Sequence, residues 1–136
     1  MTNEHPMNTV QQRRMFQSAA VFNWLACLIF LPATSIASYL GFTPLMGNGP
    51  FEHVALMAIA LLGYGYWMVS RDPIAHRGII VLGIIGKLVV VVILFGHYFF
   101  ATGMNLRQAS LALVDLAYAV MFMRALKSLA TAGSRH

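Results

Sequence analysis

Two oppositely charged residues lie deep inside long apolar stretches of this chain. Lys87 is near the middle of the apolar run 78–100, and Asp115 lies nine residues before Arg124. A lysine at the centre of a membrane helix costs roughly 2.5–3.5 kcal/mol on insertion scales, so it normally faces a partner or a wet cavity. Counted from the basic residues at one membrane boundary, at ~1.5 Å per residue, both residues reach a similar depth. We therefore predict that Lys87 and Asp115 pair across adjacent helices.

The role of this intramembrane polar pair stays open between two interpretations. A static ion pair would fix the register of the helices, whereas a functional pair would respond to a proton or a ligand. Tyr98 and Tyr118 lie close to the same faces and are expected to extend the polar seam. Asn23, the remaining polar residue of a span, is expected to make an interhelical amide hydrogen bond.

A second group of ionisable residues is predicted at the opposite helix ends, in the outer leaflet. It consists of Glu52, His53, His97 and Arg107. Two histidines and a carboxylate could bind a metal, and two histidines on facing helices could ligate a haem. No spaced metal motif is present, and adjacent Glu52 and His53 diverge by about 100° on a helix. We therefore expect no metal and no haem here, and predict either a hydrogen-bonded interfacial group or an outer-leaflet pocket for a lipid headgroup or a quinone ring.

The composition requires a membrane to hold these residues. With 59% hydrophobic and 10% charged residues among 136, the chain has too little polar surface to cover a soluble core. Four apolar stretches are long enough to cross the ~30 Å hydrocarbon layer. We predict an all-α integral membrane protein, a four-transmembrane-helix bundle. A single domain would occupy 13–127, between a mobile cytoplasmic tail at 1–12 and a second cytoplasmic tail at 128–136.

Turn and cap residues predict where the four helices begin and end. The first helix is expected over about 15–40, with a kink at Pro32, and the second over 51–70. Asp72 is expected to cap the third helix, over 73–100, with Pro73 at its first position. Asn105 and Gln108 form a capping-box pattern that predicts a fourth helix over about 105–126.

Basic residues predict the orientation in the membrane. One side of the predicted bundle receives Arg13, Arg14, Arg71, Arg77, Arg124, Lys127 and Arg135, and the other only Arg107. Because Lys and Arg concentrate in cytoplasmic loops, both termini are expected in the cytoplasm. The basic residues then report topology, and we expect no nucleic-acid partner. Tyr66 and Trp67 are expected at the inner aromatic belt.

Short stretches of the second and third predicted helices share a pattern with a known family. They are Gly63-Tyr64-Gly65-Tyr66-Trp67, Arg71-Asp72-Pro73, Arg77-Gly78 and Gly83-Ile84-Ile85-Gly86-Lys87. This pattern, over roughly a third of the chain, resembles the small four-helix bacterial membrane proteins of the DoxX-like group. That group is mostly uncharacterised, and a few relatives are associated with quinone-linked respiratory or thiosulfate-oxidising complexes. The resemblance implies a bacterial inner-membrane protein in a quinone or redox setting, and it carries over no catalytic residue.

Three function classes follow from these residues. The leading hypothesis is a non-enzymatic module that binds a lipid- or quinone-like ligand, or a partner protein, through its polar seam. A small proton-coupled transporter acting as a homo-oligomer is the second, with Lys87 or Asp115 as the coupling site. The third is a redox or lipid-modifying membrane enzyme that uses the outer histidines. No nucleophile-and-base constellation is present, which argues against a hydrolase.

Overall fold

The part of the chain that the structure describes folds into four long helices and one short one. The computed structural model describes residues 9–42, 49–100 and 105–133, without the side chains of 132 and 133. The helices are α1 (Thr9–Phe30), α2 (Ile36–Tyr39), α3 (Pro50–Arg71), α4 (Arg77–Phe100) and α5 (Leu106–Gly133). All regular structure in these described ranges is helical, as the sequence predicts.

Three of the helices are long and apolar enough to cross a membrane, within the part of the chain that the structure describes. They are α3, α4 and α5 up to Thr131. Helix α1 has 22 residues, but its first turns carry Gln11, Gln12, Arg13 and Arg14. Its apolar part is therefore shorter than a full span, and the predicted fourth crossing is not established by length and composition.

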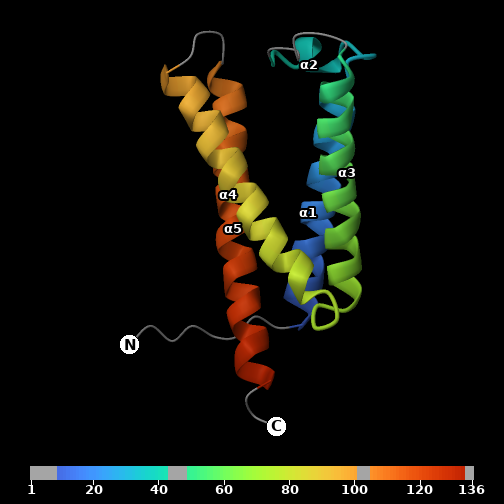
Figure 1. Cartoon of the computed structure of the whole chain (residues 1–136), viewed down its shortest axis with the longest axis vertical. Coiled ribbons are helices and arrows are strands. Elements are labelled where there is room, and N and C mark those ends of the chain that lie inside the picture. Colours follow the sequence, from blue (N-terminus) through green and yellow to red (C-terminus); the bar gives the residue numbers. More distant parts are fainter. Residues whose placement is uncertain (1–8, 43–48, 101–104, 134–136) are drawn as a thin grey trace.

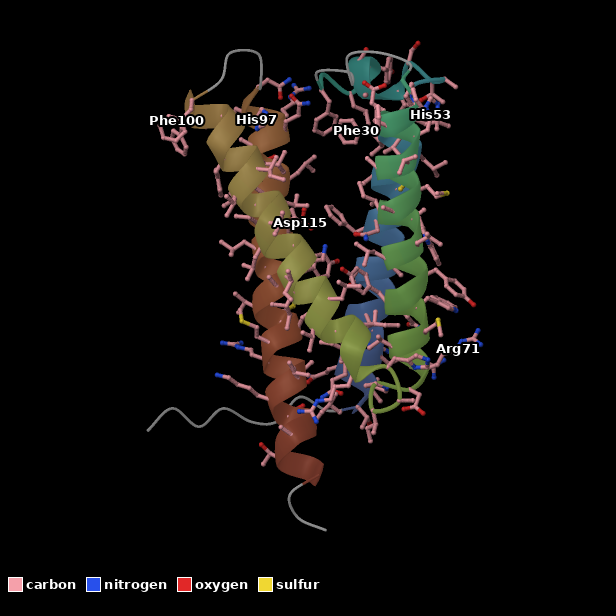
Figure 2. All side chains as sticks on the ribbon, viewed as in Figure 1. Phe30, His53, Arg71, His97, Phe100 and Asp115 are labelled. Atoms are coloured by element: carbon pink, nitrogen blue, oxygen red, sulfur yellow. The ribbon has the colours of Figure 1, made fainter. Side chains whose placement is uncertain are left out.

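The long helices form two pairs that diverge from one end of the molecule. Helix α1 packs along α3, and α4 packs along α5. Figure 1 shows α4 slanting away from α1 and α3, so that the two pairs are closest where α3 connects to α4 and farthest apart near α2. We refer to these two ends as the Arg71 end and the α2 end; Arg71 is labelled in Figure 2.

Small residues and side-chain donors explain the close packing of α1 on α3. A Cβ at Gly63 would lie 2.7 Å from Nε1 of Trp24 and 3.2 Å from the Ala20 carbonyl oxygen, so glycine is needed there. Trp24 Nε1 donates to the Ala60 carbonyl at 3.2 Å. Asn23 Nδ2 donates to the Ile59 carbonyl at 3.2 Å, which is the interhelical amide bond expected from the sequence.

The hydrophobic core lies toward the Arg71 end and draws on all four long helices. The rings of Phe16, Tyr66 and Phe122 are its largest fully buried members. Phe122 lies 4.8 Å from Phe16 and 5.0 Å from Tyr66 between ring centroids, the second contact edge-on. Such tilted and edge-on contacts are favoured geometries for aromatic pairs. This core joins the two helix pairs at the end where they are closest.

The structure corrects the predicted course of the first helix. Instead of a kinked helix over 15–40, α1 ends at Phe30 and a separate turn leads to α2. Pro32 has no amide hydrogen to donate and disfavours helical geometry in the residue before it, so the helix stops rather than bends. Thr34 N–H donates to the Leu31 carbonyl at 2.9 Å in the turn that follows.

The α3–α4 connection also differs from the prediction. Asp72 caps, but it caps the turn 73–76: its Oδ1 accepts from the amides of Ile74 at 3.1 Å and Ala75 at 3.0 Å. Helix α4 therefore starts at Arg77 and not at Pro73. The capping box of α5 is present as predicted, with Gln108 N–H donating to Asn105 Oδ1 at 3.0 Å.

Both predicted tails are shorter than expected. Helix α1 begins at Thr9 and α5 continues to Gly133. Gln12 is buried, and its Nε2 donates to Ser128 Oγ at 2.7 Å, so the first turn of α1 packs on the last turns of α5. Residues 1–8 and 134–136, and most of the predicted loops 41–50 and 101–104, lie outside the described residues.

Candidate binding cleft

Lys87 and Asp115 form an ion pair between α4 and α5. Lys87 Nζ donates to Asp115 Oδ1 at 2.5 Å, and the two side chains are only 5% and 12% exposed. The pair predicted from helix depth is therefore present. Charge-assisted bonds of this kind are short and strong, and the attraction between the two charges offsets part of the cost of burying them.

Three aromatic rings surround the Lys87 ammonium. Its Nζ lies 5.1 Å from the ring centroid of Tyr118, 5.5 Å from Phe22 and 5.6 Å from Tyr66. A cation within about 6 Å of a ring is attracted by the ring quadrupole. Tyr118 also donates its hydroxyl to Ser18 Oγ at 3.1 Å, which ties α5 to α1 beside the pair. Residues of α1, α3 and α5 thus hold the Lys87 head group in place.

A cavity of about 340 Å³ opens beside this pair, between the two helix pairs. Its lining residues come from α1 (Phe22, Asn23, Ala26, Phe30), α3 (Ala55, Leu56, Ile59, Leu62, Tyr66), α4 (Gly86, Lys87, Val90, Leu94) and α5 (Gln108, Leu111, Asp115). Pockets that bind small molecules are concave, mostly apolar and carry a few convergent polar groups. This cleft has that character.

Polar groups of the cleft gather at its inner part. Along their helices, the lining residues Asn23, Tyr66, Lys87 and Asp115, which we call the polar floor, come closer to the Arg71 end than the other lining residues of α3 and α5 and most of those of α1 and α4. Toward the α2 end the walls are apolar, with Phe30, Leu94 and Ala55, and Gln108 is the polar exception. Figure 2 shows Phe30 pointing from α1 toward the gap between the helix pairs. A molecule with one polar head and an apolar chain matches this gradient.

Hydrogen bonds also join the two helix pairs at the α2 end. Arg107 Nη1 donates to the Leu40 carbonyl at 2.7 Å, and Asn105 Nδ2 donates to the Gly41 carbonyl at 2.9 Å. We call these two bonds the clasp. Gly41 has a positive φ of 75°, and a Cβ there would meet the Arg107 guanidinium. Glycine at this position therefore permits both the turn and the clasp.

The four residues of the predicted outer-leaflet pocket are not among the cleft-lining residues that the structure describes. Glu52 accepts from the Gly49 amide at 3.0 Å and so caps its own helix. The Nδ1 atoms of His53 and His97 donate to backbone carbonyls four residues earlier in the chain. Figure 2 shows the two histidines on different helix pairs. Arg107 takes part in the clasp, and no contact between Glu52 and Arg107 is found in the described part of the chain.

The sequence argued against a metal site and placed Tyr98 and Tyr118 in the polar seam. In the described residues, no group of three or more His, Cys, Asp or Glu side chains is placed to hold a metal ion. Tyr98 does not line the cleft; its ring packs edge-on against Phe99, with centroids 5.2 Å apart. Tyr118, in contrast, does lie beside Lys87.

Sequence reasoning missed the aromatic part of the site. Phe22, Phe30 and Tyr66 line the cleft, and Tyr66 was expected at the membrane interface. Instead Tyr66 is 1% exposed and lies against α4 at Gly83. The sequence does carry a signal for this packing, since Gly83 and Gly86 lie close to Lys87 on α4. A glycine leaves room either for a large side chain from another helix or for a cavity.

The known proteins provide no guide to this cleft. Comparison with protein-family models, with curated proteins and with solved structures finds no match to the chain.

Proposed function

We propose that this chain is a small inner-membrane module that binds a lipid- or quinone-like amphiphile in the cleft between its helix pairs. The observation that carries the proposal is the cleft itself, with an ion pair and two further polar side chains at one end and apolar walls at the other. Three of the four helices that line the cleft, α3, α4 and α5, are long and apolar enough to span a membrane. A ligand would therefore be held at the depth of the hydrocarbon layer.

The proposal includes four crossings with both termini in the cytoplasm. Helix α1 matches α3 in length and packs along it, so a bilayer that contains α3 would also surround α1. The polar first turn of α1 contacts the last turns of α5 at Ser128, at the end that carries most of the basic residues. A bacterial cytoplasmic membrane fits this charge bias and the resemblance to the DoxX-like group.

Binding is favoured over catalysis by the placement of the histidines. An enzyme that used the outer histidines would need them to converge on one substrate. His53 and His97 are exposed, each bonds to the backbone of its own helix region, and they belong to different helix pairs.

Mass spectrometry of the purified full-length chain tests this function. We expect a co-purified amphiphile in an organic extract of the wild type, and its loss in Ala26→Phe, which places a ring in the cleft. Leu25→Phe is the matched control, because Leu25 is 51% exposed and does not line the cleft. Equal amounts of the same molecule on both variants, with both folded, would contradict binding in the cleft.

A further inference from the structure

The polar floor of the cleft indicates which head groups it can accept. Its two charged members compensate one another, because Lys87 Nζ is bonded to Asp115 Oδ1. The other two members, Asn23 and Tyr66, are uncharged. No other charged side chain lines the cleft in the described part of the chain. The floor therefore has hydrogen-bonding groups but no net charge.

The ion pair still has hydrogen-bonding capacity toward the cleft. An ammonium has three donors and an ionised carboxylate has two acceptor oxygens. Among the described residues, the structure gives Lys87 Nζ one hydrogen bond and gives Asp115 Oδ2 none. No buried side-chain oxygen or nitrogen in this part of the chain is left without a partner, so Asp115 Oδ2 is not sealed in the core. It is available at the cleft surface.

Given the function proposed above, we infer that the ligand of this cleft is an amphiphile with an uncharged, hydroxyl- or carbonyl-bearing head group. A hydroxyl donates to Asp115 Oδ2, and a hydroxyl or carbonyl oxygen accepts from Lys87 Nζ. The apolar chain extends along Phe30 and Leu94 toward the α2 end.

Charged head groups fit the floor poorly for an electrostatic reason. An ion that loses its hydration on entering an apolar cleft must be compensated by an opposite charge. An anion near Lys87 also lies near Asp115, because the two charged atoms are only 2.5 Å apart, so attraction and repulsion largely cancel. A cation is attracted by Asp115 and repelled by the neighbouring Lys87, so these two interactions also largely cancel.

The depth of the floor supports the same conclusion independently. Helix α4 has 24 residues and begins at Arg77. Lys87 is ten residues further along the chain, which is ~15 Å along the helix axis. A head group must therefore reach the middle of the hydrocarbon layer, where polar backbone and charged groups are costly and uncharged head groups much less so.

Photolabelling with matched 12-carbon amphiphiles tests the inference. The full-length chain in lipid nanodiscs is labelled with 1-dodecanol that carries a diazirine in its chain, and the adducts are mapped by mass spectrometry. We expect adducts on the cleft-lining Phe30 and Leu94, and not on the outward-facing Leu25 and Tyr64. Unlabelled 1-dodecanol should compete at least roughly tenfold better than ionised laurate or dodecyltrimethylammonium, since an unpaired ion loses its hydration in the cleft.

Two outcomes separate this inference from the proposed function. Cleft adducts with laurate competing as well as 1-dodecanol would overturn the uncharged head group and leave binding in the cleft intact. Adducts only on Leu25, Tyr64 and other outward residues, with every probe, would overturn both.

An isosteric variant provides the second measurement. Asp115→Asn removes the negative charge of the floor, so laurate should gain on 1-dodecanol by roughly tenfold as Lys87 becomes available to an anion. An unchanged preference in folded protein would overturn the electrostatic argument. Should this variant fail to fold, the double variant Lys87→Met with Asp115→Leu is used, because it leaves no uncompensated charge in the interior. In the double variant, 1-dodecanol should lose its advantage over dodecane. A retained advantage would contradict the inference.

Discussion

The ring of Tyr66 lies directly against Gly83 where α3 meets α4. A Cβ at Gly83 would be 2.7 Å from Tyr66 Cε1, 3.0 Å from its hydroxyl oxygen and 3.1 Å from Phe122 Cε2. Tyr66 is also one of the rings around Lys87, at 5.6 Å. The absence of a side chain at Gly83 thus allows Tyr66 to pack in the core and to contribute to the polar floor as well.

Gly83→Ala should destabilise the protein by about 1–3 kcal/mol, because both rings are fully buried and overpacking forces them to shift. Unfolding followed by circular dichroism in detergent measures the effect. Gly96→Ala is the control on the same helix, since a Cβ at Gly96 meets nothing within 4 Å. Equal stabilities of the two variants would show that the contact of Tyr66 with Gly83 is not tight.

The Lys87–Asp115 pair should behave as a unit in a double-mutant cycle. Lys87→Met alone and Asp115→Leu alone each leave an uncompensated buried charge, which typically costs about 3–5 kcal/mol. The double variant should be close to the wild type, because apolar replacements of both partners need no compensation. Additive losses, measured by the same unfolding assay, would mean that the two residues do not interact.

The clasp should control how far the helix pairs separate at the α2 end. Gly41→Ala forces a side chain into a left-handed backbone conformation, at roughly 1–2 kcal/mol, and into the Arg107 guanidinium. Spin labels at Val54 and Phe99, both exposed near the α2 end, should then report a longer and broader distance distribution. Gly78→Ala is the control, with open space at its Cβ. An unchanged distribution in Gly41→Ala would show that the clasp does not hold the two pairs.

Thiol labelling distinguishes four crossings from three. In a Cys27→Ser background, single cysteines replace Val10, Tyr39 or Ile74, which are 53%, 90% and 75% exposed. Four crossings with cytoplasmic termini predict that positions 10 and 74 label from the cytoplasm and position 39 from the periplasm. Labelling of positions 10 and 39 from the same side would mean that α1 does not cross the membrane.

Helix depth could be predicted from the sequence, whereas the direction of side chains around each helix could not. The rise per residue is nearly constant, so counting from basic boundaries placed Lys87 and Asp115 at one height, and the structure pairs them. His53 and His97 were predicted to meet because both lie near helix ends in the predicted outer leaflet. These two residues lie on helix pairs that diverge, and each finds a closer backbone partner.

Local competition explains the remaining differences. Pro32 could kink or end a helix, and the apolar pattern continues beyond it, so the sequence alone did not decide between a kink and an end at Phe30. Gln12 and Ser128 look like tail residues in sequence, but they bond to one another between α1 and α5. Long-range contacts of this kind cannot be read from the chemistry of either residue alone.

Where a 12-carbon alcohol lies in the protein is the most direct test of the cleft as an amphiphile site. Nuclear Overhauser effects between 1-dodecanol and the full-length chain in micelles report which side chains lie next to the bound alcohol. We predict effects from the carbinol protons to the rings of Tyr66 and Phe22, and from the terminal methyl group to Phe30 and Leu94. Effects confined to outward-facing side chains such as Leu25 and Tyr64, with none to Tyr66 or Phe22, would contradict it.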